Sequence, residues 1–138
     1  MSASQIEMSS GLQCFVGIET KDIQEILIRS ARDLISLETP NYQYAAARLL
    51  LYAVRKQVFG SGWTSGYPSV YDHVVKCADH DVYDKDILDK YTEEEWNQIE
   101  SWIDHDRDML FTYAGLRQVV DKYLVQDRST GKVYETPQ

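Results

Sequence analysis

The residues whose types and spacing first suggest chemistry form an acidic stretch at positions 104–108, Asp-His-Asp-Arg-Asp. Its carboxylates alternate with other side chains, as they do at the first, third and fifth positions of a calcium-binding loop. Such a loop also needs glycine at its sixth position and a bidentate glutamate at its twelfth, where this sequence has Met109 and Gly115. The sequence therefore excludes a calcium loop of this kind.

A transition-metal site around His105 is a second hypothesis for residues 104–108. Adjacent residues rarely converge on one ion, and no second cluster in the sequence pairs with His105. We therefore interpret residues 104–108 as a solvated or salt-bridged connection between helices, and we expect no metal site. Residues 79–81, Asp-His-Asp, receive the same interpretation as part of an acidic surface.

The two cysteines, Cys14 and Cys77, belong to no metal-binding or redox motif. Nucleophilic catalysis needs a cysteine or serine with a partner base and an orienting group, and no recognisable motif of this kind occurs. We expect no catalytic residue, and we expect both thiols to be reduced and buried, as in a cytosolic protein. A single disulfide in a secreted protein is the alternative, which the polar first residues disfavour because they do not form a signal peptide.

Thr20 and Lys56 could together bind an anion. A hydroxyl and free amides at the start of a helix can accept a phosphate, and a lysine from the next helix could neutralise its charge. The alternative is that Thr20 is an ordinary helix cap and Lys56 a solvated lysine. The glycines at positions 60, 62 and 66 do not follow a strand, so they indicate a linker and no phosphate-binding loop.

The elements that must position these residues are mainly helical. Apolar residues recur at three- and four-residue spacing through most of the sequence, whereas segment 60–68 is rich in glycine. Residues 124–134 have strand-like stretches on both sides of Ser129-Thr130-Gly131, which predicts a small β-hairpin. We expect helices at residues 4–15, 20–39, 40–59, 85–91 and 92–103, another beginning at residue 69, and a last one that includes residues 113–123.

Capping residues mark several of the expected helix starts. Ser4 and Glu7 have the spacing of a capping box, and Thr20 is placed to cap the second helix. The strongest capping box is Thr-Glu-Glu-Glu at residues 92–95. The middle of helix 40–59 is apolar around most of its circumference, so we expect this helix to be the most buried element.

Length and charge restrict the class of protein. A chain of 138 residues can close a single core, and its 43% hydrophobic and 26% charged residues are typical of a folded soluble protein. A net charge of -8, without clustered Lys and Arg, argues against nucleic acid and anionic membrane as partners. The sequence has no signal-peptide pattern and no apolar run long enough to cross a bilayer, so we expect a cytoplasmic protein.

Several segments, taken in order, also carry a resemblance to a known family. They lie at residues 22–24, 31–36, 40–44, 46–49, 71–75, 91–95, 104–109, 111–115, 122–125 and 130–135. In this order and spacing they are similar to the N-terminal region of class I ribonucleotide reductase large subunits of the bacterial and bacteriophage type. The resemblance covers the chain from about residue 4 to residue 138.

The resemblance implies three parts of the chain. Residues 1–59 correspond to a partial ATP cone, residues 60–68 to a linker, and residues 69–138 to the helical region before the barrel, ending in the β-hairpin. It also implies that the chain lacks the opening segment of the cone and the ten-stranded α/β barrel, which carries the reactive cysteines and the substrate site. The fold that we expect is therefore mainly α, with a small C-terminal β-hairpin.

The same resemblance implies a residual site for an effector nucleotide. Thr20 and Lys56 match family positions that contact the nucleotide, and Tyr52 matches an aromatic position near its base. Gln24 stands where many relatives carry histidine. Because the opening segment of the cone has no counterpart, we expect weak or absent binding of ATP or dATP, and no other cofactor in this chain.

The function implied is that of the N-terminal portion of a split or truncated ribonucleoside-diphosphate reductase large subunit. It would contribute to reducing ribonucleotides to deoxyribonucleotides only together with a barrel-bearing large-subunit polypeptide, and it would not be catalytic alone. A separate small subunit would supply the metal-radical cofactor. Trp96, Trp102 and Tyr113 are the expected contacts with the barrel. The alternative is a non-catalytic helical interaction or regulatory module, or a gene remnant.

Overall fold

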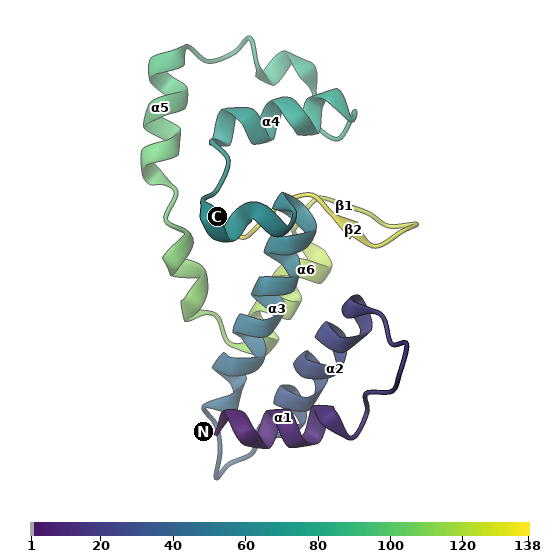
Figure 1. Ribbon diagram of the computed structural model, residues 1–138. Coiled ribbons are helices and arrows are strands. Elements are labelled where there is room, and N and C mark those ends of the chain that lie inside the picture. Colours follow the sequence, from purple (N-terminus) through teal and green to yellow (C-terminus); the bar gives the residue numbers. More distant parts are fainter. Residues whose placement is uncertain (1) are drawn as a thin grey trace. The chain divides into compact units, whose positions relative to one another are not determined.

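The computed structural model describes residues 2–138, which are mainly helical (Figure 1). This confirms the predicted fold class, because the strands of the described chain form a single antiparallel hairpin that pairs Gln126 with Val133 and Asp127 with Lys132. The α-helices are α1 (Ala3–Gly11), α2 (Thr20–Asp33), α3 (Tyr42–Phe59), α4 (Val70–Asp79), α5 (Glu93–Trp102) and α6 (Tyr113–Lys122). The 3₁₀ helices are η1 (Ser61–Ser65), η2 (Lys85–Ile87) and η3 (His105–Leu110), and the strands are β1 (Gln126–Asp127) and β2 (Lys132–Val133).

The chain forms two compact units, each made from two separate stretches of sequence. The first unit contains the residues up to Ala53 together with Met109–Lys122, and the second contains Val54–Asp108 and Tyr123–Gln138. Helix α3 begins in the first unit and ends in the second. The division into residues 1–59, 60–68 and 69–138 stays a prediction that rests on the resemblance.

The first unit contains α1, α2, α6 and the larger part of α3. Tyr42, at the start of α3, is 1% exposed, and its hydroxyl accepts a hydrogen bond from the backbone N–H of Ser2 at 2.9 Å. The same hydroxyl contacts the side-chain oxygen of Gln5, so a single buried tyrosine connects α1 to α3. The apolar core of this unit consists of Ile26, Ala31, Tyr42, Ala46, Ala47, Leu50, Leu51, Leu116 and Val120.

The second unit contains the end of α3, then α4, α5 and the hairpin. Ser69 caps α4, because its side chain accepts from the backbone N–H of Asp72, and Thr92 with Glu95 forms a complete capping box at α5. Both predicted starts are therefore confirmed. The apolar core of this unit consists of Val54, Val58, Val74, Cys77, Ala78, Trp96, Leu124 and Val133.

Helix α3 has more buried positions than the other described helices, as its sequence predicts. Its buried residues recur at three- and four-residue spacing, which places them on one broad face. One of them, Arg55, is charged. The buried positions of α3 are Tyr42, Ala46, Ala47, Leu50, Leu51, Val54, Arg55 and Val58.

Two of the predicted caps and two of the predicted helix ends, at residues 15 and 39, are wrong. Helix α1 is preceded by Ser2 without a side-chain cap, so Ser4 lies inside the helix, and α1 ends at Gly11. Helix α2 has Glu19 at its N-cap position and Thr20 as its first helical residue. It ends at Asp33, before the expected residue 39, and the hydroxyl of Thr39 donates to the Leu34 carbonyl at 2.7 Å. Such local hydroxyl bonds compete with helix continuation.

Candidate functional site

The residues predicted to contact a nucleotide lie on α2 and α3. Thr20 is the exposed first residue of α2, and Gln24 lies one turn further along the same helix. Tyr52 and Lys56 are four residues apart on α3, so they share one face of it, and Tyr52 is 45% exposed. Thr20 and Tyr52 belong to the first unit and Lys56 to the second. The role of these residues in nucleotide binding stays a prediction.

A buried ion pair lies in the second unit, between Arg55 of α3 and Asp108 of η3. The guanidinium Nη2 lies 3.0 Å from the Asp108 Oδ2, and the two side chains are 2% and 0% exposed. The same Nη2 also donates to the backbone carbonyl of His105. Burial raises the pKa of Asp108, and the hydrogen bond from Arg55 opposes that rise. Removing charges from water is unfavourable, so each partner depends on the other.

Aromatic rings from segment 60–68 surround this ion pair. The guanidinium carbon of Arg55 lies 5.5 Å from the ring centroid of Trp63 and 5.3 Å from that of Tyr67, within the range of cation–π contacts. The Tyr67 ring also stacks on His105, with their centroids 3.7 Å apart. Gly60 and Gly66 have φ values of 81° and 145°, which favour glycine where the backbone enters and leaves η1. The glycine-rich segment is therefore packed against the ion pair.

The interpretation of residues 104–108 as a salt-bridged connection is confirmed, with Asp108 paired to Arg55 and Arg107 to Asp104. The burial of Arg55 was not predicted from the sequence, although the position of Arg55 in its helix indicates it. Arg55 follows Leu51 by four residues and precedes Val58 by three, which places it on the apolar face of its helix. An arginine at such a position needs a buried acidic partner.

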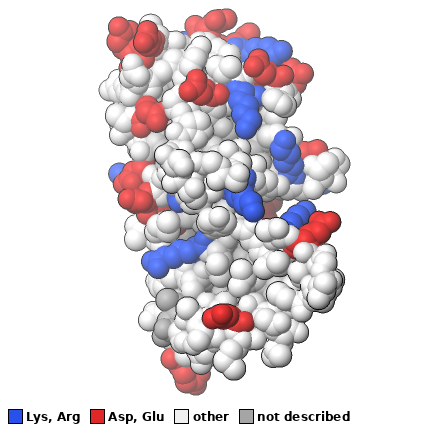
Figure 2. Space-filling model, viewed as in Figure 1, with Lys and Arg blue, Asp and Glu red and all other residues white. Residues whose placement is uncertain are grey.

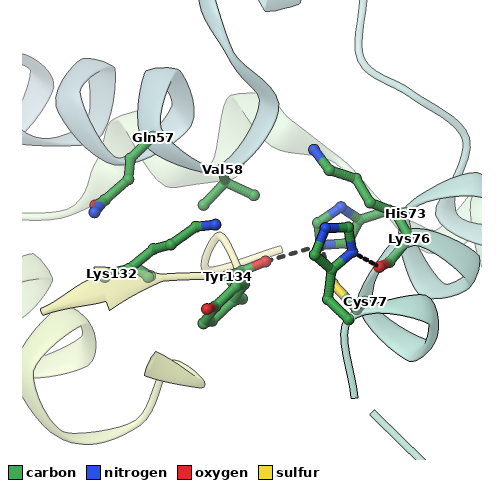
Figure 3. Close-up of a pocket in the computed structure, with 9 residues that line it drawn as sticks. Gln57, Val58, His73, Lys76, Cys77, Lys132 and Tyr134 are labelled. Atoms are coloured by element: carbon green, nitrogen blue, oxygen red, sulfur yellow. Dashed lines mark hydrogen bonds between the residues drawn. The ribbon is translucent and has the colours of Figure 1, made fainter. Parts of the chain in front are cut away.

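A small cavity of about 60 Å³ lies beside α4, next to His73 and Cys77 (Figure 3). The His73 Nε2 lies 2.9 Å from the Tyr134 carbonyl oxygen and 3.6 Å from the Cys77 sulfur. A carbonyl can only accept, so Nε2 carries the proton and cannot act as a base toward the thiol. Burial also raises the pKa of Cys77. The pair is therefore not an activated nucleophile.

The rim of this cavity is positively charged. Lys76 of α4 and Lys132 of β2 both line it, and the Lys132 ammonium lies 4.9 Å from the ring centroid of Tyr134 (Figure 3). Burial lowers the pKa of His73, so its imidazole adds no charge at neutral pH. Both lysines are exposed. The rim is therefore a solvated basic surface and not an enclosed anion site.

The three predicted contacts with a barrel differ in their exposure. Trp102, at the end of α5, is 63% exposed, and Tyr113 is half-buried at the start of α6. Trp96 is only 7% exposed, so the prediction that it offers a contact face is wrong. Its ring is covered by Tyr71 and Tyr91, whose ring centroids lie 5.6 and 5.4 Å away.

Further predicted features have mixed outcomes. Both cysteines are free, but only Cys77 is buried, so the expected burial of Cys14 is wrong. Across residues 2–138, no group of three or more His, Cys, Asp or Glu residues is arranged to hold a metal ion. Within the same residues, no helix is both long enough and apolar enough to cross a membrane.

Comparison with known proteins relates the whole chain to one group of enzymes. It is 49% identical over 138 residues to the ribonucleoside-diphosphate reductase 1 subunit alpha of Escherichia coli K12, and 47% identical over the same length to the subunit alpha of Haemophilus influenzae. It is 48% identical over 122 residues to the subunit alpha of Enterobacteria phage T4. In the order given, the three alignments cover 100%, 100% and 88% of this chain. They cover only 18%, 18% and 16% of the three relatives. No family model matches the chain.

These identities define the class of protein first: the chain is a relative of the alpha, or large, subunits of class I ribonucleotide reductases. More particularly, it corresponds to the N-terminal region of those subunits, and it spans about 18% of the length of the curated relatives that it matches over its whole length. The resemblance seen in the sequence is therefore confirmed.

Proposed function

We propose that this chain acts as the N-terminal portion of a ribonucleoside-diphosphate reductase large subunit. In this role it contributes to the reduction of ribonucleotides to deoxyribonucleotides in the cytoplasm, together with a barrel-bearing polypeptide and a small subunit that supplies the metal-radical cofactor. The observation that carries the proposal is the identity of 47–49% over the whole chain to alpha subunits of bacteria.

The side chains of the described residues are consistent with a reaction whose reacting groups lie on another part of the enzyme. The buried thiol of Cys77 lies beside an imidazole that cannot accept its proton. The buried ion pair of Arg55 and Asp108 is closed off by aromatic rings, so it supports the fold of the second unit and reaches no substrate. We therefore propose that the barrel-bearing polypeptide carries the reacting groups, and that in a split enzyme it is a separate chain.

Native mass spectrometry of the chain, purified under mild conditions from its source cell, tests this assembly. We expect a complex with a larger polypeptide that contains the barrel. We also expect the purified pair, mixed with the small subunit, to form deoxyribonucleoside diphosphate, whereas neither large-subunit chain does so alone. A lone monomer that adds nothing to a barrel-bearing polypeptide would contradict the proposal.

We further propose that Thr20, Tyr52 and Lys56 are a residual effector site that binds ATP or dATP weakly. Of these three residues only Lys56 carries a positive charge, whereas a nucleoside triphosphate carries several negative charges that need compensation. The net charge of -8 adds long-range repulsion. Calorimetric titration with ATP should therefore show no micromolar binding, and a weak signal at higher concentration should disappear in Lys56→Ala. Micromolar affinity would contradict this proposal.

A further inference from the structure

A second and larger hollow lies in the second unit, along α4, the connection that follows it, and α5. Its volume is about 460 Å³, within the range of small-ligand sites, which is about 300–1,000 Å³. Its apolar walls come from Tyr71 of α4, Leu88 after η2, and Tyr91 and Trp96 at α5. We call this hollow the aromatic groove, and it is separate from the His73 cavity.

The aromatic side chains of the groove are held in a fixed arrangement. Tyr71 and Tyr91 both meet Trp96 edge to face, with interplanar angles of 69° and 75°. Trp96 is 7% exposed and anchors the pair, while each tyrosine is 44% exposed. Rings held in this way offer electron-rich π surface to a guest without first having to become ordered.

The charged side chains of the groove are acidic, and its neutral polar lining residues are Ser69 and Asn97. Glu93 and Glu100 of α5 line it, and no Lys or Arg is among its described lining residues. One oxygen of Glu100 accepts a hydrogen bond from the backbone N–H of Val70 at 2.5 Å, which fixes that carboxylate beside the start of α4. Figure 2 shows Asp and Glu side chains along the upper edge of the view, where the connection from α4 and the start of α5 lie in Figure 1.

The aromatic rings and the carboxylates of the groove together favour a positively charged ligand. A cation is attracted by the faces of the rings and by the carboxylates at the same time. An anion would be repelled, and a neutral apolar guest would desolvate the carboxylates without compensation. We propose that the aromatic groove binds a cationic side chain, arginine or lysine, of a partner polypeptide. The inference goes beyond the proposed function, because binding of a cationic side chain in the groove does not depend on whether the partner polypeptide carries the barrel.

The probe for this site is the peptide acetyl-Leu-Arg-Leu-amide, titrated into the complete 138-residue chain and followed by NMR. The indole N–H signal of Trp96 is identified by its loss in Trp96→Phe. We expect this signal to shift in a saturable way, with the signals of Trp63 and Trp102 unchanged. The matched control is the same peptide with citrulline, which keeps the shape of arginine without its charge and should bind at least fivefold more weakly.

Two variants of one helix turn complete the test. Glu93→Gln removes a carboxylate that lines the groove and should weaken binding of the arginine peptide at least threefold. Glu94→Gln removes another exposed charge, outside the described lining, and should leave binding unchanged, which controls for net charge. Circular dichroism checks that both variants fold. Equal binding of the citrulline peptide, equal effects of the two variants, or no shift of the Trp96 signal would overturn the inference.

Discussion

At the scale of single residues, the buried pair of Arg55 and Asp108 joins two distant positions of the second unit. Both side chains are almost fully buried, and they lie 53 positions apart in the sequence. A buried pair of this kind is often no more stabilising than apolar residues of the same size, but removing one partner is costly because the other charge stays buried.

We therefore expect Asp108→Asn to lower the free energy of unfolding by about 3–5 kcal/mol, measured by urea denaturation. Asp106→Asn, at an exposed position two residues away, should change it by less than about 0.5 kcal/mol. The double variant Arg55→Met with Asp108→Leu should regain most of the lost stability, since no unpaired charge remains. If Asp108→Asn is no worse than Asp106→Asn, the pair does not stabilise the fold.

His73 gives a pH dependence whose sign follows from its environment. Burial lowers its pKa in the folded chain, and Lys76 lowers it further, while its bond to the Tyr134 carbonyl and the charge of Glu135 oppose this shift. The unfolded chain therefore binds a proton more readily. The contribution of His73 to stability is complete above the unfolded pKa of about 6.5 and is lost as the pH falls through the lower pKa of the folded state.

We expect the chain to be less stable at pH 5 than at pH 7.5 in urea denaturation. Burial also lowers the pKa of His105, which acts in the same direction. His73→Gln keeps a side-chain N–H for the Tyr134 carbonyl but cannot be protonated, so it should reduce this pH dependence. An unchanged slope in His73→Gln would contradict the assignment.

At the scale of elements, helix caps separate two threonines that look alike in the sequence. Thr92 caps α5 with its side chain, whereas Thr20 lies inside the first turn of α2 and no side-chain cap bond forms there. Thr92→Ala should therefore lower the free energy of unfolding by about 1 kcal/mol, and Thr20→Ala should have a smaller effect. Thermal and urea denaturation measure both, and equal losses would show that the capping box does not operate.

The hairpin depends on its turn. The carboxylate of Asp127 accepts hydrogen bonds from the backbone N–H and the hydroxyl of Ser129 and from the hydroxyl of Thr130, at 2.6–2.8 Å. These bonds lower the pKa of Asp127 to about 2. Gly131 follows with a φ of 72°, a conformation that glycine adopts without strain. Turn residues therefore define a hairpin whose two strands are joined by two residue pairs.

At the scale of the whole molecule, the proposed assembly with a barrel-bearing polypeptide depends on exposed apolar residues. Trp102 is the most exposed of the three predicted contacts, and it ends α5 with 63% of its surface in solvent. We expect Trp102→Asp to abolish complementation of the barrel-bearing polypeptide, measured as deoxyribonucleotide formation. Trp102→Phe should retain most of it, because the apolar contact remains. Full activity of Trp102→Asp would exclude this docking face.

The sequence by itself determined the features that depend on neighbours within a few residues. Apolar spacing predicted six of the helical segments, the capping residues at 69 and 92 marked two starts, and Ser129-Thr130-Gly131 marked the hairpin turn. The succession of short motifs also identified the family, which the comparisons confirm. The spacing, capping and turn signals each lie in one short stretch of chain, and the resemblance depends only on the order of short segments, so none of them requires knowledge of packing.

Only the tertiary structure decided which faces meet. Trp96 has the same aromatic character as Trp102, yet one is covered by Tyr71 and Tyr91 and the other is exposed. Three features join residues from separate elements: the ion pair of Arg55, the lysine rim of the His73 cavity, and the acidic aromatic groove. Burial and charge pairing depend on contacts between distant parts of the chain, and periodicity within one element carries no information about its partner.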